Sequence, residues 1–231
     1  MSDGGMRATW DAAAAADRID DYVGDPATAR AELDGLFGRL GDDGRAGVCV
    51  EVGCGPGRMT GLLAERFDRV VAVDVSSEML ELARSRVPSP MVDFRRVGGE
   101  RLDSVEDAIA DVLVCYLVLQ HLPERRLVVS YVREFGRVLS PGGRAFVQIP
   151  VMQNGVRSTA WRALRRFALP VATRLRGGVA AQAAYRGVRL KESELERALA
   201  DAGLRVAARD EGTDSPYRYA REVFLRLEHL D

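Results

Sequence analysis

The stretch that decides the fold is VCVEVGCGPG, residues 48–57 of this 231-residue chain. Its first half, Val48–Val52, is an apolar run with β-branched residues and predicts a short buried strand. Three glycines follow at alternate positions: Gly53, Gly55 and Gly57. Glycine permits the backbone torsions and the close ligand approach that a tight strand-to-helix turn requires. At the end of the strand, the carboxylate of Glu51 can accept a hydrogen bond from a cationic group of a ligand.

Strand and helix patterns alternate on both sides of this turn. Residues 69–73 predict a second strand, and 111–118 form a nearly continuous apolar run that is typical of a strand buried on both faces. Further strands are predicted at 91–97, 144–149, 204–209 and 219–227, and helices at 58–67, 76–86, 124–139 and 191–202. This order predicts a doubly wound α/β fold with a mainly parallel seven-stranded sheet and helices on both faces. In such a sheet, ligands bind at the carboxyl ends of the strands.

Composition excludes several classes of protein. The formal net charge is -1, so the chain as a whole has no strong bias toward nucleic acid or a membrane surface. The N-terminus lacks the apolar segment of a signal peptide, and no apolar run reaches the roughly 18 residues of a membrane span. We therefore expect a cytoplasmic protein. The cysteines have no CxxC spacing, which favours neither a disulfide framework nor a metal site: Cys49, Cys54 and Cys115.

The glycine spacing also separates two kinds of cofactor. A dinucleotide-binding turn requires G-x-G-x-x-G, whereas here the third glycine comes one residue early, at Gly57. A carboxylate at Glu51 would suit a pyrophosphate poorly and an amino group well. Asp74 closes the second strand, and a carboxylate there can bind the two hydroxyls of a ribose. A nicotinamide-dependent reductase is therefore the weaker alternative.

Four blocks of the sequence resemble the class I methyltransferases that use S-adenosylmethionine (SAM). In chain order they are VEVGCGPGRMT, VVAVDVSSEMLELAR, DVLVCYLVLQHLPE and LSPGGRAFVQI, and they cover about residues 48–147. The resemblance implies SAM as cosubstrate and S-adenosylhomocysteine (SAH) as product. It departs from the family at Gly98, where Asp or Asn often stands and would bond the adenine amine.

The resemblance also assigns residues to each part of the cofactor. The methionine part would be lined by Glu51, Gly53, Cys54, Gly55 and Gly57. Asp74 would hold the ribose hydroxyls. The adenine would be flanked by Val75, Ser76 and Met79, with Gly99 and Glu100 at its edge. Tyr116 would border the methyl group.

Candidate residues for methyl transfer follow the fourth predicted strand. SAM itself supplies a reactive methyl group, so the protein mainly holds a nucleophile in line with it and excludes water. His121 is the candidate general base, although a purely structural role is the commoner one for a His in this block. Gln120 and Tyr116 could position an acceptor, or could serve packing and helix entry instead.

An uneven charge pattern points to the acceptor side. Between Pro150 and Lys191 there is no Asp or Glu, whereas arginines recur beside apolar residues at helical spacing, among them Arg165 and Arg166. This basic segment could be a solvated face or could pair with the acidic N-terminal helices across the pocket mouth. It could also be a site for an acidic substrate, or a docking surface for a membrane or carrier protein. The N-terminal region is acidic, and Trp10 and Tyr22 could pack over a ligand.

We expect one domain in four parts. They are an N-terminal helical cap or lid (1–46), the SAM-binding core (47–150), a basic helical insertion over the substrate pocket (151–190), and a C-terminal helix with strands (191–231). The predicted activity is methyl transfer to an O, N or C nucleophile of a small molecule, with acidic and secondary metabolites as the classes considered. Nucleic acid is not expected as a substrate, because the net charge is only -1 and no aromatic-basic nucleic-acid module is present. Residues 115–118 also lack the Asn/Asp-Pro-Pro-aromatic block of the methyltransferases that modify amino groups of nucleic acids. A SAM-binding domain that acts through a partner is the non-enzymatic alternative, and the oligomeric state is left open.

Overall fold

The computed structural model describes residues 3–14, 26–41, 47–152, 187–212 and 220–230. These ranges form one seven-stranded sheet with the strand order β3-β2-β1-β4-β5-β7-β6. The strands are β1 (Val48–Val52), β2 (Arg69–Asp74), β3 (Val92–Arg96), β4 (Ala110–Cys115), β5 (Leu139–Met152), β6 (Leu204–Gly212) and β7 (Ala220–His229). The strand order runs outward in opposite directions from the β1–β4 pair, so a ligand crevice is expected beyond the carboxyl ends of these two strands.

The sheet is mixed. Strands β1 to β5 pair in parallel, whereas β7 runs antiparallel to both β5 and β6. The predicted α/β fold and the seven strands are confirmed. Residues 213–219 alone separate the last two strands, and antiparallel neighbours can be joined by a connection this short.

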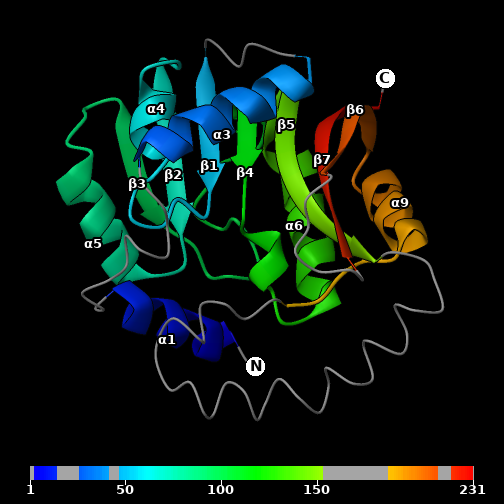
Figure 1. The fold of residues 1–231 in the computed structure, drawn as a ribbon, viewed down its shortest axis with the longest axis horizontal. Coiled ribbons are helices and arrows are strands. Elements are labelled where there is room, and N and C mark those ends of the chain that lie inside the picture. The colour runs from blue at the N-terminus through cyan, green and yellow to red at the C-terminus, as the bar shows by residue number, and fades with distance from the viewer. Residues whose placement is uncertain (1–2, 15–25, 42–46, 153–186, 213–219, 231) are drawn as a thin grey trace.

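Helices cover both faces of the sheet, as predicted (Figure 1). They are α1 (Asp3–Ala14), α3 (Pro26–Arg39), α4 (Thr60–Ala64), α5 (Ser77–Arg86), η1 (Leu119–His121), α6 (Arg125–Val138) and α9 (Glu192–Asp201). One face packs against α3 and α4, and the other packs against α6 and α9. Figure 1 shows α1 across the end of the sheet, beneath the parallel strands. No helix in the described ranges is long and apolar enough to cross a membrane.

The strands are apolar on both faces because each face has its own helical layer. In β2, Val70 and Ala72 pack into the cluster with α3 and α4, whereas Val71 and Val73 pack into the cluster with α6. All four side chains are fully buried. This alternation is why the parallel strands read as continuous apolar runs rather than as an amphipathic pattern.

Helix α3 belongs to the core of the molecule. Phe37 meets Phe146 of β5 edge to face, with 4.7 Å between ring centroids. Leu33 and Leu36 are also buried against the sheet. In contrast, α1 packs against α5 at the end of the strands. The described parts of the N-terminal region therefore occupy two different places.

Several predicted boundaries need correction. The predicted helix at 58–67 is shorter, Thr60–Ala64, since its last turn tightens where the Arg66 amide donates to the Leu63 carbonyl. The predicted strand at 111–118 ends at Cys115, because Leu117 has a φ of 60°, which no strand accommodates. The predicted strand at 144–149 extends over Leu139–Met152.

Candidate functional site

A cavity of about 350 Å³ lies at the carboxyl ends of β1, β2 and β4. That volume falls within the range of small-molecule sites. Its lining comes from the loops predicted to carry the chemistry, together with α1. The described residues that line it are Trp10, Glu51, Val52, Gly53, Cys54, Gly55, Pro56, Arg58, Met59, Asp74, Val75, Met79, Val97, Val114, Tyr116, Leu117, Val118, Gln120, His121, Leu122 and Tyr131.

The glycine turn after β1 requires glycine for two different reasons. Gly53 has a φ of 74°, and a Cβ there would lie 2.4 Å from Cγ2 of Val118. Gly55 has a φ of 53°, and a Cβ there would meet nothing within 4 Å. Gly53 thus lets two loops approach each other, whereas Gly55 keeps its backbone open toward the cavity. The turn is fixed to β2 because the Gly53 and Cys54 amides both donate to the Val73 carbonyl.

Glu51 presents a buried carboxyl group to the cavity. The residue is 5% exposed, and its Oε2 accepts a hydrogen bond of 2.6 Å from the Thr60 hydroxyl. Burial raises the pKa of Glu51 to about 7, with a smaller contribution from the negative charge of Asp74. The carboxyl group therefore titrates near neutral pH, and a ligand cation at this position would favour its charged form.

Asp74 joins the glycine turn to the start of α5. Its Oδ2 accepts from the Gly55 amide and its Oδ1 from the Ser76 amide, both at 2.9 Å. Burial raises the pKa of Asp74, and these backbone hydrogen bonds oppose the rise. Ser76 is the N-cap of α5, as predicted, and its hydroxyl accepts from the Met79 amide at 3.1 Å. Asp74 holds together the two turns that line this side of the cavity.

The segment after β4 has a strained backbone beside the cavity. Leu117 adopts a φ of 60° without being a glycine. Its amide donates to Oε1 of Gln148, a β5 side chain that is only 2% exposed. A buried side chain thus holds a conformation that is unfavourable on its own, which is a common arrangement next to functional sites.

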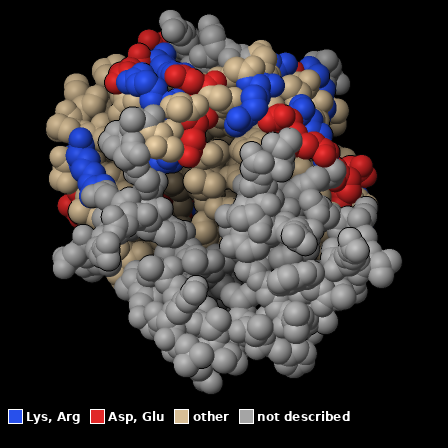
Figure 2. Space-filling view, viewed as in Figure 1, with Lys and Arg blue, Asp and Glu red and all other residues tan. Residues whose placement is uncertain are grey.

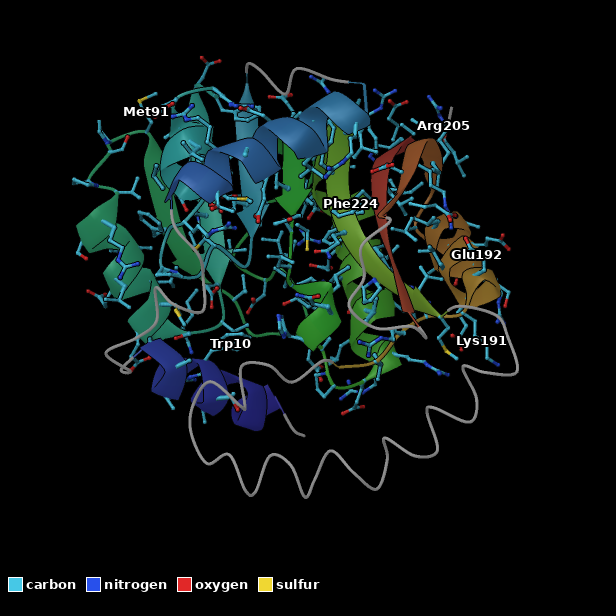
Figure 3. All side chains as sticks on the ribbon, viewed as in Figure 1. Trp10, Met91, Lys191, Glu192, Arg205 and Phe224 are labelled. Atoms are coloured by element: carbon cyan, nitrogen blue, oxygen red, sulfur yellow. The ribbon has the colours of Figure 1, made fainter. Side chains whose placement is uncertain are left out.

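Aromatic side chains close the end of the cavity nearest α1. The rings of Trp10 and His121 meet edge to face, with centroids 5.3 Å apart, and Figure 3 shows Trp10 at α1, below the ends of the strands. Nε2 of His121 lies 3.2 Å from Nε2 of Gln120. Met79 packs with Trp10 and Ala13, so α1 covers the start of α5. Trp10, a predicted residue near the N-terminus, thus meets the predicted pair Gln120 and His121, which is far from it in the chain.

The structure brings most predicted cofactor residues to this cavity. Those that line it are Glu51, Gly53, Cys54, Gly55, Asp74, Val75, Met79 and Tyr116. Four others lie outside its lining: Gly57, Ser76, Gly99 and Glu100. Gly57 faces Val87 and Ala83, where a Cβ would come within 3.2–3.3 Å. Three further predicted residues, Tyr22, Arg165 and Arg166, lie outside the described residues, as does most of the basic insertion.

Near Gly98, where the edge of the adenine was expected to pass, the structure shows other contacts than a side chain at position 98 would make. The exposed Glu100 carboxylate pairs with Arg126 at 2.8 Å. The Gly98 amide donates to Oδ1 of Asp103 at 2.9 Å. A Cβ on Gly98 would lie 3.5 Å from Oδ2 of the same carboxylate. Asp103 thus places a carboxylate beside the position where the chain lacks a side chain.

Sequence reasoning missed three polar residues around the cavity. Thr60 is fully buried and bonds Glu51, and its signal was a hydroxyl residue nine positions after an acidic strand end. Arg58 lines the cavity and pairs with Glu32 of α3 at 2.8 Å. The Arg58–Glu32 pair had no signal in the sequence, because its members lie 26 positions apart and meet only when α3 packs on the sheet.

Charges of both signs are interspersed on the described surface around α3 (Figure 2). Ion pairs account for several of them, including Arg30–Glu65 and Arg39–Asp210. Arg39 also lies over the ring of Phe224, which is labelled on β7 in Figure 3. Within the described ranges, no three His, Cys, Asp or Glu side chains are grouped so that they could hold a metal ion. Cys49, Cys54 and Cys115 are buried.

Residues 50–147 match the family model of a methyltransferase domain. This segment belongs to the class I SAM-dependent methyltransferase family. The domain is 36% identical over 103 residues to the N-demethylindolmycin N-methyltransferase of Streptomyces griseus, a match covering 44% of this chain and 43% of that protein. It is 34% identical over 134 residues to the trans-aconitate 2-methyltransferase of Azoarcus sp., covering 57% and 49%. The chain spans about half the length of the curated relatives it matches.

The methyltransferase fold extends beyond the matched segment. The magnesium protoporphyrin IX methyltransferase of Synechocystis PCC 6803, solved with bound SAH, aligns with 98% of this chain and all of that one at a TM-score of 0.68. The two sequences are only 15% identical. At that identity the likeness establishes a common fold and nothing about the acceptor.

Proposed function

We propose that this chain is an enzyme that transfers the methyl group of SAM to an O, N or C nucleophile of a small molecule. One observation carries the proposal. Two buried carboxyl groups, Glu51 and Asp74, stand at the ends of neighbouring parallel strands on a single cavity beside an open glycine backbone. A ligand that carries both a cation and a diol fits that pair.

The residues present fit the cofactor. Asp74 would bind the ribose hydroxyls with carboxylate lone pairs that its backbone donors leave free. The open backbone at Gly55 and its neighbour Cys54 would follow the methionine part, and Val75 and Met79 would contact the adenine. Ser76 would act through the N-cap that positions Met79. Asp103 would supply a carboxylate near the adenine edge, where Gly98, Gly99 and Glu100 pass.

Glu51 would respond to the charge of the cofactor. In the free protein, burial disfavours its ionised form. The ammonium group of a bound methionine moiety would provide the missing counter-charge, and Thr60 would keep the carboxylate oriented. Binding is then coupled to ionisation of a group whose pKa is about 7.

The end of the cavity between Trp10 and His121 would receive the acceptor. SAM supplies an electrophilic methyl group on a sulfonium. The protein then needs to hold a nucleophile in line and to exclude water, and Trp10, Leu122 and Tyr131 provide an apolar and aromatic wall for this purpose. His121 would take a proton from an acceptor that must lose one, and Gln120 and Tyr116 would orient that acceptor.

We propose that the acceptor is a small molecule. The curated relatives carry names for different acceptors, an N-demethylindolmycin and a trans-aconitate among them. Arg165 and Arg166 would add cations if the acceptor is an acid. Of the predicted N-terminal cap, 1–46, we propose that the part with α1 covers the pocket, since α3 packs on the sheet instead. We also propose that residues 151–190 form a second cover and that the protein works in the cytoplasm.

The proposal is tested by ligand-induced thermal stabilisation of the purified chain with SAM, SAH or NADH. A ligand at about 100 times its Kd should stabilise the protein by roughly 2.7 kcal/mol. We expect stabilisation by SAM and SAH and none by NADH. Stabilisation by NADH alone would instead support a reductase. Incubation with labelled SAM and a panel of small acids and phenols, trans-aconitate included, then measures turnover, and binding without any turnover would favour a domain that acts through a partner.

A further inference from the structure

The last four residues of the basic insertion, which we call the anchor segment (187–190), lie against the acceptor end of the cavity. The Gly187 amide donates to the Gln120 carbonyl at 2.6 Å, and the Val188 amide donates to the Leu122 carbonyl at 3.0 Å. The two acceptors stand on either side of His121 in the chain. Because Gln120, His121 and Leu122 all line the cavity, the anchor segment holds the backbone of three cavity residues.

The anchor segment is itself fixed to the end of β5. The Met152 amide donates to the Leu190 carbonyl at 2.9 Å, and the Leu190 amide donates to the Pro150 carbonyl at 3.2 Å. Leu190 is buried in the core, and Nε of Arg125 on α6 donates to the Arg189 carbonyl at 3.2 Å. The segment then leads directly into α9 (Figure 1). Its position is therefore set by the sheet and by α6, independently of any ligand.

The loop that carries η1 is supported from β5 at both of its ends. At its start, the buried side chain of Gln148 on β5 accepts from the Leu117 amide at 2.8 Å. At its end, the anchor segment transmits the position of the last β5 residues to Gln120 and Leu122. Strand β5 is paired on both sides, with β4 and β7. The place of His121 relative to the strand ends therefore depends on these two supports.

Gly187 is the point at which the anchor segment has no room for a side chain. A Cβ there would overlap the carbonyl oxygen of Leu122 and would lie 3.0 Å from the carbonyl carbon of His121. Both are backbone atoms, which cannot rotate away as the end of a side chain can. Gly187 is not among the glycines with a positive φ, so its torsions are not what require glycine. Glycine is required because two backbones approach each other closely here.

We propose that Gly187 is a positioning residue for methyl transfer, because its contact with the η1 loop sets where Gln120 and His121 meet the acceptor. The inference rests on the proposed function and deepens its acceptor end. A displacement of about 1 Å, caused far from the reacting atoms, can slow an enzyme by about 100-fold. Gly187 lies outside residues 50–147, so the match to the family model does not supply this role.

The test compares the full chain with two glycine variants, Gly187→Ala and Gly136→Ala. The chain has only two histidines, so NMR follows the ring resonances of His121 and His229 separately, with His229 on β7 as the internal reference. Gly136→Ala is the matched control. Its Cβ would also overlap a backbone carbonyl oxygen, that of Ala202, but this contact joins α6 to α9 and involves no residue of the cavity lining.

We expect Gly187→Ala to shift the His121 resonance and to leave that of His229 in place. For the acceptor found in the turnover screen, kcat/KM should fall at least about tenfold, whereas the dissociation constant of SAH should change less than about twofold. Gly136→Ala should lose stability and leave both resonances and kcat/KM as in wild type. An unchanged His121 resonance in a folded Gly187→Ala would overturn the inference, as would a loss of SAH affinity as large as the loss of kcat/KM.

Hydrogen exchange on the wild-type chain adds a measurement that needs no variant to fold. The Gly187 and Val188 amides should be protected, because both donate to carbonyls of the η1 loop. Rapid exchange of both amides would show that the anchor is not formed and would overturn the inference. A wild-type chain that fails to bind SAH would instead overturn the proposed function, which neither the His121 resonance nor amide exchange tests.

Discussion

The two ends of the cavity are built differently. One end, which we call the glycine-loop end, is formed by Glu51, Gly55 and Asp74. The other, which we call the helical end, is formed by Trp10, Gln120 and His121. Every group at the glycine-loop end is fixed by a backbone hydrogen bond or by burial in the sheet. The helical end is held by contacts between side chains from α1 and η1, such as the edge-to-face contact of Trp10 with His121.

This difference in how the two ends are held indicates which end of the site can change in sequence without loss of the fold. Groups fixed by strand ends cannot move without disrupting the sheet, so the glycine-loop end suits a ligand that is always the same. Groups on a short helix and a terminal helix can be exchanged at small cost to the fold, so the helical end suits a ligand that differs between enzymes. The predictions below test whether the two ends are separable.

The largest effect is expected for Asp74→Ala. The variant removes the acceptor of the Gly55 and Ser76 amides and the proposed partner of the ribose. We expect SAH affinity, measured by calorimetry, to fall by at least about 100-fold, or about 2.7 kcal/mol. Asp93→Ala, which removes an exposed carboxylate from the neighbouring strand β3, is the control and should bind normally. Normal binding by a folded Asp74→Ala would contradict the assignment of the glycine-loop end.

The next largest effect is the difference in stability between alanine variants of two glycines in the turn. Gly53→Ala places a methyl group 2.4 Å from Val118 at a positive φ, so we expect about 3 kcal/mol of destabilisation in denaturant unfolding. Gly55→Ala has the same kind of torsion but open space around the new methyl group, so we expect only about 1 kcal/mol. That methyl group would instead project toward the cavity and weaken SAH binding. Equal loss of stability in the two variants would show that Gly55 is not open to the ligand.

A pH-dependent effect is expected for Glu51→Gln. In wild type the pKa of this carboxyl is raised to about 7. A raised pKa contributes stability that is present below the unfolded value and is lost as the pH rises through 7, about 3 kcal/mol in all. The Gln variant keeps the Thr60 contact, so its stability should fall less between pH 5 and about 8 than that of wild type.

Ligand binding should show the opposite trend with pH. Because the cation of the ligand needs an ionised Glu51, wild-type SAH affinity should rise as the pH increases through about 7, and Glu51→Gln should lose about tenfold at pH 8 and vary little. Glu134→Gln is a matched control. Burial disfavours the charge of Glu134, but hydrogen bonds from Arg137 and the Leu102 amide outweigh this and lower its pKa. Its removal should therefore cost stability at neutral pH and leave SAH affinity unchanged.

The smallest effect on the affinity for SAH is expected for Trp10→Ala. The variant loses the aromatic contact with His121 and the cover over Met79, and we expect SAH affinity to fall by only about threefold. Trp10→Phe, which keeps an aromatic edge, should lie closer to wild type. The KM for whichever acceptor the turnover screen identifies should rise more than the SAH dissociation constant. A loss of SAH affinity as large as that of Asp74→Ala would show that the two ends are not separable.

Much of the glycine-loop end was predictable from the sequence. The turn Gly53–Gly57 and the acids at the ends of two strands are contiguous motifs, and the backbone pattern of a parallel sheet brings consecutive strand ends together. The Ser76 cap and the start of α5 were predicted for the same local reason. Four residues that the sequence assigned to the cofactor lie outside the cavity lining, namely Gly57, Ser76, Gly99 and Glu100.

The sequence by itself determined the α/β sheet, its glycine turn and the two carboxylates, because each depends on torsions and hydrogen bonds between near neighbours or on one sheet edge. Only the tertiary structure decided three other features, namely the partner of Arg58, the contact of Trp10 with His121, and the strained Leu117 held by Gln148. Each joins residues that are far apart in the chain, and their distance depends on how whole helices and strands pack. The physical reason is that local propensity fixes an element, whereas side-chain packing between elements fixes which groups meet.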